Sequence, residues 1–311
     1  MNRPAGWEPC SVSALRRGDP LEGSGSRGVR WLMVELAGPW GHSALLDSPA
    51  LLSPELGREI AGRAQEADVR IAAIRRPGRR PQHRRWRWAL ADSRPGHESL
   101  RWGEVDGPVG YAEIPLDGTA GTPAEEPLVA VCTHGKHDQC CAVRGRGAAA
   151  RIAERHPEAT WECSHLGGDR FAATMLLLPH GLFYGRVDQA EDPADIVTRY
   201  IEGRVDDRYL RGRSSYPAEV QSAQHHARAM IADDRIDAFA PLDVVDTDGH
   251  VEVTLEGPSG PVRVLLRETY SDPIFTMCKA HAPGPVKQWE LVEINGEPPE
   301  AADPSADRKI V

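Results

Sequence analysis

Two short segments in the middle of the chain contain four of its six cysteines and three of its twelve histidines. Residues 131–141 read VCTHGKHDQCC, and residues 161–171 read WECSHLGGDRF. Thiolates and imidazoles at this density are typical of a bound metal or of reactive sulfur rather than of packing. Each segment begins at the end of a predicted buried strand, so we expect the two to lie side by side at one edge of an α/β sheet.

The predicted elements around these segments follow the order strand, helix, strand, hairpin and helix. They are expected at 128–132, 144–155, 159–163, 171–178, 182–187 and 192–202. Asp192 is the expected cap of the last helix, with Pro193 at its first position. This order is that of a thioredoxin-like α/β domain, which the sequence predicts over residues 128–235.

A second α/β block is expected at 29–127, ahead of this domain. A strand at 31–36, a helix at 53–66 capped by Ser53, and strands at 69–74 and 86–89 resemble a partial copy of the same order. We expect this N-terminal extension to pack alongside the main sheet or to extend it. An arginine-rich turn occupies 75–85, and residues 93–127 are expected to form a connecting segment.

The two ends of the chain differ from the centre. Residues 1–28 are rich in Gly, Ser, Pro and Arg and are predicted to form a flexible lead-in. After a predicted helix at 217–232, alternating apolar residues predict a β-rich C-terminal subdomain over 242–296. Its strands are expected at 251–255, 262–266 and 289–294. Residues 297–311 are expected to be a mobile tail.

Charge and hydropathy exclude two classes of protein. The net charge of −9 argues against a general nucleic-acid binder, because phosphate contacts require a basic surface. No apolar run approaches the roughly 18 to 20 residues that span a bilayer, and residues 1–20 lack the apolar core of a signal peptide. We therefore expect a cytoplasmic protein, in which cysteines serve as ligands or redox groups rather than as disulfides.

The residues themselves leave several kinds of site open. A [2Fe–2S] cluster, a zinc ion or no metal at all is compatible with the two segments. The absence of a C-x-x-C spacing disfavours a dithiol oxidoreductase. Zinc knuckles pair ligands two to four residues apart, whereas eight residues separate Cys132 from Cys141. The dipole of the following helix would stabilise anionic sulfur at Cys140 and Cys141.

Three motifs resemble the sucrase/ferredoxin-like family, which are thioredoxin-like [2Fe–2S] ferredoxins. They are CTHG at 132–135 with DQCC at 138–141, SHLGGDRFAA at 164–173, and LPHGLFYG at 178–185. The resemblance is dense over 128–205 and looser through GPWG at 38–41. It implies that the domain at 128–235 is a thioredoxin-like ferredoxin, to which the residue patterns add the N-terminal α/β extension, a possible partial repeat, and the small β-rich C-terminal subdomain.

The resemblance also implies a set of cluster ligands. Cys132 and Cys141 would hold one iron through thiolate, and His165 would bind the second. Family members with two histidines carry the second one four residues later, where this chain has Asp169. Cys163 is the best chemical substitute, because thiolate binds iron–sulfur iron better than carboxylate does. Cys140 and Asp169 are the alternates.

Other residues of the two segments are expected to support the cluster. Gly167 and Gly168 allow the backbone to approach a bulky group without a side-chain clash. His134 and His137 are expected to tune the cluster or to be exposed, and Arg170 to face the cluster charge or to form an ordinary ion pair. Cys278, with no partner near it in the sequence, is expected to be a packed thiol rather than a ligand.

The sequence therefore leads to three functional hypotheses. The first is a ferredoxin-like protein that transfers single electrons between a reductase and an acceptor, so that its partners are redox proteins. The second is a cluster-containing oxidoreductase whose own substrate binds near the β-rich C-terminal region. The third is a zinc-stabilised binding module. No convincing pair of carboxylates for glycoside hydrolysis is found.

Overall fold

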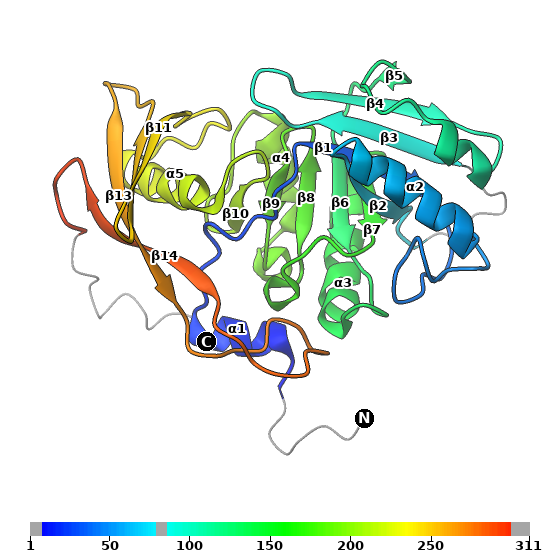
Figure 1. The fold of residues 1–311 in the computed structure, drawn as a ribbon, viewed down its shortest axis with the longest axis horizontal. Helices are drawn as coiled ribbons and strands as arrows, with labels where there is room; N and C mark the ends of the chain where they lie inside the picture. The colour runs from blue at the N-terminus through cyan, green and yellow to red at the C-terminus, as the bar shows by residue number, and fades with distance from the viewer. Residues whose placement is uncertain (1–7, 79–85, 300–311) are drawn as a thin grey trace.

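A computed structural model describes residues 8–78 and 86–299, and its strands form two sheets (Figure 1). The arginine-rich turn at 79–85 and the tail from residue 300 onward lie outside the described residues. The large sheet has ten strands. In spatial order they are β10 (Leu210–Arg213), β9 (Leu182–Tyr184), β8 (Met175–Leu178), β6 (Leu128–Cys132), β7 (Thr160–Cys163), β2 (Arg70–Arg75), β1 (Arg30–Glu35), β3 (Arg87–Asp92), β4 (Ser99–Glu104) and β5 (Thr122–Pro123).

One half of this sheet has the predicted thioredoxin-like order. Strands β6 and β7 are parallel and are connected by α3 (Gln139–Arg155), while β8 and β9 form an antiparallel hairpin beside β6. Helix α4 (Pro193–Ile201) follows after the short 3-10 turn η3 (Val187–Gln189). The Asp192 side chain accepts a hydrogen bond from the Ala194 amide, which confirms the predicted cap.

The other half repeats this topology. Strands β1 and β2 are parallel and are connected by α2 (Pro54–Glu66), and β3 and β4 follow as antiparallel neighbours on the β1 side. The two halves join edge to edge, because β2 pairs antiparallel with β7 through Ile74 and Cys163. The prediction of a partial repeat that extends the same sheet is confirmed. The joint also removes two exposed strand edges, which are sites of aggregation in isolated sheets.

Several elements differ from the expectation. The expected lead-in contains α1 (Cys10–Arg17), in which Cys10 and Ala14 are buried, so a flexible segment is wrong for this helix. The expected connecting segment at 93–127 contains β4, the 3-10 helix η1 (Pro108–Glu113) and β5. The β4 side chains are mostly half exposed and those of β5 are exposed, so neither strand has the clear apolar alternation that predicts a strand.

Helix α3 begins five residues earlier than predicted, at Gln139. The Asp138 side chain accepts a hydrogen bond from the Cys140 amide and so starts the helix. Cys140 and Cys141 therefore lie in its first turn. The strand expected at 171–178 begins only at Met175, after the 3-10 turn η2 (Asp169–Phe171). The edge strand β10 was not expected.

The C-terminal residues form a separate antiparallel sheet, which confirms the predicted β-rich subdomain, but it has four strands because β11 (Pro241–Thr247) adds to the three expected ones. Its other strands are β12 (His250–Leu255), β13 (Val262–Tyr270) and β14 (Lys287–Ile294). Helix α5 (Ala218–Ile231) packs on it through Val220, Ala223 and Ala227 (Figure 1). The connection between β13 and β14 returns to the main domain and carries Cys278. Within the described ranges, no helix combines the length and apolar character needed to cross a bilayer.

Candidate metal centre

The two cysteine–histidine segments meet at one end of the sheet. Cys132 and Cys163 end the parallel strands β6 and β7 and are paired in register, so the loops that follow them are neighbours. The second loop is held to β2 because Ser164 Oγ accepts a hydrogen bond from the Ala73 amide (3.0 Å), and the Ser164 amide donates to the Ala73 carbonyl (2.8 Å). The predicted juxtaposition of the two segments is confirmed.

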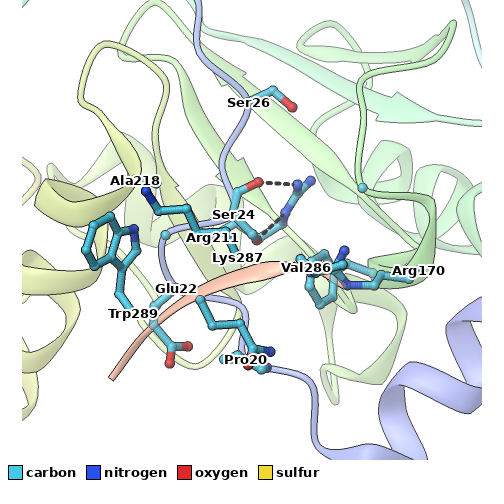
Figure 2. A pocket seen from close by; sticks show the side chains of 14 residues that line it. Pro20, Glu22, Ser24, Ser26, Arg170, Arg211, Ala218, Val286, Lys287 and Trp289 are labelled. Atoms are coloured by element: carbon cyan, nitrogen blue, oxygen red, sulfur yellow. Dashed lines mark hydrogen bonds between the residues drawn. The ribbon is translucent and has the colours of Figure 1, made fainter. Parts of the chain in front are cut away.

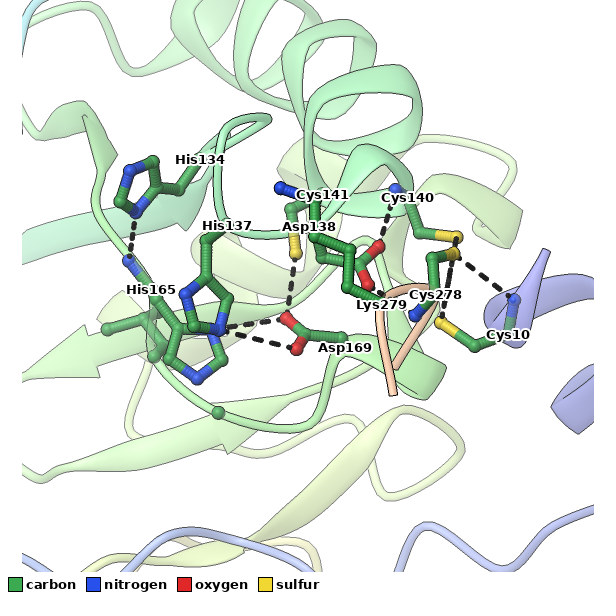
Figure 3. A network of polar contacts seen from close by, with 12 residues as sticks. Cys10, His134, His137, Asp138, Cys140, Cys141, His165, Asp169, Cys278 and Lys279 are labelled. Atoms are coloured by element: carbon green, nitrogen blue, oxygen red, sulfur yellow. Dashed lines mark hydrogen bonds and ion pairs between the residues drawn. The ribbon is translucent and has the colours of Figure 1, made fainter. Parts of the chain in front are cut away.

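A continuous line of polar contacts connects the two loops (Figure 3). The Cys141 thiol is the group that most strongly affects the pKa of the Cys132 thiol. Cys141 Sγ lies 3.2 Å from Asp169 Oδ1, and His165 Nδ1 lies 3.1 Å from the same carboxylate oxygen. Two sulfurs, a carboxylate and an imidazole therefore converge within one small volume. Among these side chains and their neighbours, ligand atoms of His137, His165 and Asp169 lie within 4.8 Å of one another, so this group could hold a metal ion.

Electrostatics favour the anionic forms of Cys132 and Asp169, whereas the neighbouring Cys132 thiol and burial raise the pKa of the Cys141 thiol well above its usual value. The hydrogen bond with Cys141 lowers the pKa of the Cys132 thiol, against the effect of its burial. Burial raises the pKa of Asp169, but the hydrogen bond and charge of His165 outweigh it, so the pKa is lowered overall. Burial conversely lowers the pKa of His165, and Asp169 reverses this and raises it. A buried group of negative charges is stabilised further by a bound cation.

The neighbouring histidines have different positions. The His137 ring stacks on that of His165 with 3.7 Å between centroids, and burial lowers its pKa to about 4. His134 Nε2 lies 2.7 Å from the Gly41 carbonyl, and its Nδ1 accepts a hydrogen bond from the His165 amide at 3.3 Å. His134 therefore holds the backbone of the His165 loop in place. His137, which like His134 was expected to tune the cluster or to be exposed, packs directly against the candidate ligand.

Cys163, which was expected as the fourth ligand, and Cys140, which was expected as an alternate, lie in different surroundings. Cys163 is fully buried, and burial raises the pKa of its thiol. Within the described part of the chain the Cys163 thiol has no hydrogen-bond partner, whereas Asp169 contacts both Cys141 and His165. The Cys140 side chain contacts Cys10 and Cys278 instead (Figure 3). These two distant cysteines were not expected to belong to any site.

Comparison with known proteins agrees with this geometry. The profile of the sucrase/ferredoxin-like family matches residues 22–212, which is well over half of the chain. The chain belongs to the sucrase/ferredoxin-like family. A search of curated proteins and a search of solved structures each gave no match. The family match contains both halves of the large sheet up to Gly212 but neither Cys10 nor Cys278.

Arg211 packs against the backbone of Gly167 and Gly168 in the motif at 164–173. Arg211 is almost fully buried and donates hydrogen bonds to the Gly167 carbonyl (3.0 Å) and to Ser24 Oγ (3.1 Å). Gly168 has φ +81°, and a Cβ atom there would lie 2.3 Å from Arg211 Nη2. The predicted close backbone approach is therefore to this guanidinium. Arg170 forms an ion pair with Asp19, in which Nε lies 3.4 Å from Oδ2.

A cavity of about 370 Å³ lies beside this loop (Figure 2). The loop after β7 that carries His165 and Asp169 contributes Gly168 and Arg170 to its lining, and the start of β14 contributes Lys287 and Trp289. Its volume lies within the range of small-molecule sites, roughly 300 to 1,000 Å³. The cavity lies between the loop that carries His165 and Asp169 and the strand β14 of the C-terminal sheet, although these two regions are far apart in the sequence.

Proposed function

We propose that this chain is a [2Fe–2S] protein that carries single electrons between a reductase and an acceptor protein. The observation that carries the proposal is the buried line of contacts from Cys132 through Cys141 and Asp169 to His165. Thiolates are the protein ligands of iron–sulfur clusters, and imidazole replaces them in some centres. When bound, the cluster supplies the one-electron chemistry, and the protein supplies ligands, burial and hydrogen bonds.

We assign Cys132 and Cys141 to one iron, and His165 with Asp169 to the other. Asp169 is preferred to Cys163 as the fourth ligand because its carboxylate already contacts both Cys141 and His165. The residues fit such a group, since two thiols with a buried carboxylate and an imidazole form a donor set that a cation would stabilise. Cys163 remains the thiolate alternative on the adjacent strand.

The burial of these residues suggests where electrons enter and leave. Cys132 and Cys141 are 1% exposed, whereas the His165 side chain is 33% exposed. His137, which stacks on His165, is 21% exposed. The histidine side of the site is therefore its approach to solvent. A redox partner is expected to dock over these two imidazoles, because solvent exposure of the ligands shortens the distance to a partner.

Metal analysis of protein purified without oxygen tests the proposal. We expect about two irons and two sulfides per chain, and their loss in Cys132→Ser and in Cys141→Ser. Cys163→Ser is the matched variant, because its cysteine ends the adjacent strand and is equally buried. It retains the cluster if Asp169 is the fourth ligand. Iron that survives both Cys132→Ser and Cys141→Ser would refute the assignment.

The cavity beside the cluster loop supports a second candidate function. An oxidoreductase that acts on its own substrate requires a binding site next to the redox centre. The cavity lined by Arg170 and Trp289 has that position and contains basic side chains from three elements, η2, β10 and β14. Turnover of a small anionic acceptor by the reduced protein alone, abolished by Trp289→Ala, would favour this function over that of a carrier.

A further inference from the structure

Three cysteines from distant parts of the chain lie in mutual contact. Cys10 begins α1, Cys140 lies in the first turn of α3, and Cys278 lies in the connection between β13 and β14. The Sγ–Sγ distances are 3.7 Å for Cys10 and Cys140, 3.3 Å for Cys140 and Cys278, and 3.5 Å for Cys278 and Cys10 (Figure 3). We call these three residues the cysteine triad.

The spacing of the triad suits one tetrahedral metal ion. Thiolates about 2.3 Å from a tetrahedral zinc lie about 3.8 Å from one another, so the three sulfurs would separate by no more than roughly half an ångström. A disulfide requires an S–S distance of about 2.05 Å and would use only two of the three thiols. A single ion can contact all three sulfurs at once.

Asp138 provides an oxygen at the same place. A carboxylate oxygen of Asp138 and the three sulfurs all lie within 4.8 Å of one another. Asp138 Oδ1 accepts from the Cys140 amide (2.8 Å) and Oδ2 accepts from the Cys278 amide (2.6 Å). Each carboxylate oxygen has a second lone pair, so these bonds orient the group and leave it able to bind a metal.

The triad and the candidate cluster site use different sides of one helix turn. Adjacent residues of an α-helix point about 100° apart, so the vicinal Cys140 and Cys141 serve different surroundings. Cys141 contacts Asp169, and Cys140 contacts Cys10 and Cys278. Cys10 and Cys278 also lie outside the region that matches the family, which runs from residue 22 to residue 212.

We propose that Cys10, Cys140 and Cys278, with Asp138 as the oxygen ligand, bind one zinc ion that is separate from the iron–sulfur cluster. Thiolate sulfur with one oxygen is a ligand set that zinc accepts in tetrahedral geometry. The ion connects α1 and the β13–β14 connection to the helix that carries Cys141. Its role is structural, because it holds α1 and the β13–β14 connection against the first turn of α3, which also carries Cys141. The proposal does not rest on the cluster.

The test is element-specific analysis of the full-length protein purified under reducing conditions from zinc-supplemented medium. We expect about one zinc per chain, with an X-ray absorption spectrum at the zinc edge that shows three sulfurs near 2.3 Å and one oxygen near 2.0 Å. Cys10→Ser and Cys278→Ser should each lower the zinc content at least about tenfold while iron and sulfide stay unchanged. Asp138→Asn should weaken zinc binding about 10- to 100-fold.

Cys163→Ser is the control, because it removes a buried thiol that makes no contact with the triad, and zinc should remain at one per chain. Circular dichroism confirms that each variant is folded. Cys278→Ser is the decisive variant, since Cys278 is only partly buried and the fold tolerates serine there more readily.

Three results would overturn the proposal. Zinc that persists in both Cys10→Ser and Cys278→Ser would place the ion elsewhere. Loss of iron in Cys278→Ser would assign the triad to the cluster instead. Wild-type protein without zinc, whether its three thiols are free or two of them form a disulfide, would show that the triad does not bind zinc. Failure of the cluster proposal is separate, because it appears in iron and sulfide alone.

Discussion

The substitution Gly168→Ala tests whether the contact with Arg211 requires glycine in the loop that carries His165 and Asp169. Gly168 has φ +81°, and a Cβ atom there would lie 2.3 to 2.7 Å from three atoms of the Arg211 guanidinium. Gly203 has nearly the same backbone, with φ +77°, but its Cβ would have no neighbour within 4 Å. The two glycines therefore share the cost of a left-handed alanine and differ only in the contact with Arg211.

The magnitudes follow from these contacts. A left-handed alanine costs about 1 kcal/mol, which is the expected loss in the free energy of unfolding for Gly203→Ala. In Gly168→Ala the buried Arg211 must also move away from the Gly167 carbonyl and from Ser24. Loss of one or two hydrogen bonds to a buried charged group adds about 2 to 4 kcal/mol. We expect about 3 to 5 kcal/mol in total for Gly168→Ala.

Urea unfolding followed by tryptophan fluorescence measures both variants, with iron content as a second readout. Gly203→Ala should retain wild-type iron, and Gly168→Ala should lose part of it because the loop that carries His165 and Asp169 is displaced. Equal free energies of unfolding for the two variants, within about 0.5 kcal/mol, would refute the reasoning. Arg211 would then not be the group that requires glycine at 168.

Two further predictions concern Asp169. In cluster-free protein, Asp169→Asn should lower the free energy of unfolding by about 1.5 to 3 kcal/mol near pH 5 to 6, and by less at pH 9, because a charge-assisted hydrogen bond is lost. The pKa of His165 is raised in the folded protein, so the stability it contributes is present below about pH 6.5 and is lost as pH rises through the folded pKa. The pKa of Asp169 is lowered, so the stability it contributes is present above about pH 3.9 and is lost as pH falls through the folded pKa. A difference in urea midpoint that does not change from pH 5 to pH 9 would contradict this. In the loaded protein, Asp169→His should raise the reduction potential by on the order of 100 mV, because a neutral imidazole replaces a carboxylate. An unchanged potential in a redox titration would exclude Asp169 as a ligand.

The fold was largely predictable because its signals are local. Ser53 and Asp192 cap their helices, and the buried strands are short apolar runs. The repeat of strand, helix, strand and hairpin was visible in the same way. What local patterns cannot predict is an exposed strand: β11 is almost entirely exposed, and β4 is half exposed, so neither shows apolar alternation. The edge-to-edge joint of β2 with β7 depends on the two halves together.

Part of the candidate metal centre was predictable from the sequence, and the cysteine triad was not. Cys132, Cys141, His165 and Asp169 lie within two short motifs, so their proximity follows from two parallel strands. The triad was missed because 130 and 138 residues separate Cys140 from its two partners, and each partner is alone in its segment. One signal was present in the sequence. Vicinal cysteines at the start of a helix cannot face the same site, so Cys140 required another partner.

Electron paramagnetic resonance of the dithionite-reduced protein tests the central claim most directly. The account predicts a rhombic signal of about one spin per chain from a [2Fe–2S] centre, with strong coupling to one histidine nitrogen. Labelling with ¹⁵N-histidine should change that coupling, and His165→Cys should remove it while the iron remains. A protein with no iron signal, or a cluster without any coupled nitrogen, would contradict the assignment of Cys132, Cys141, His165 and Asp169.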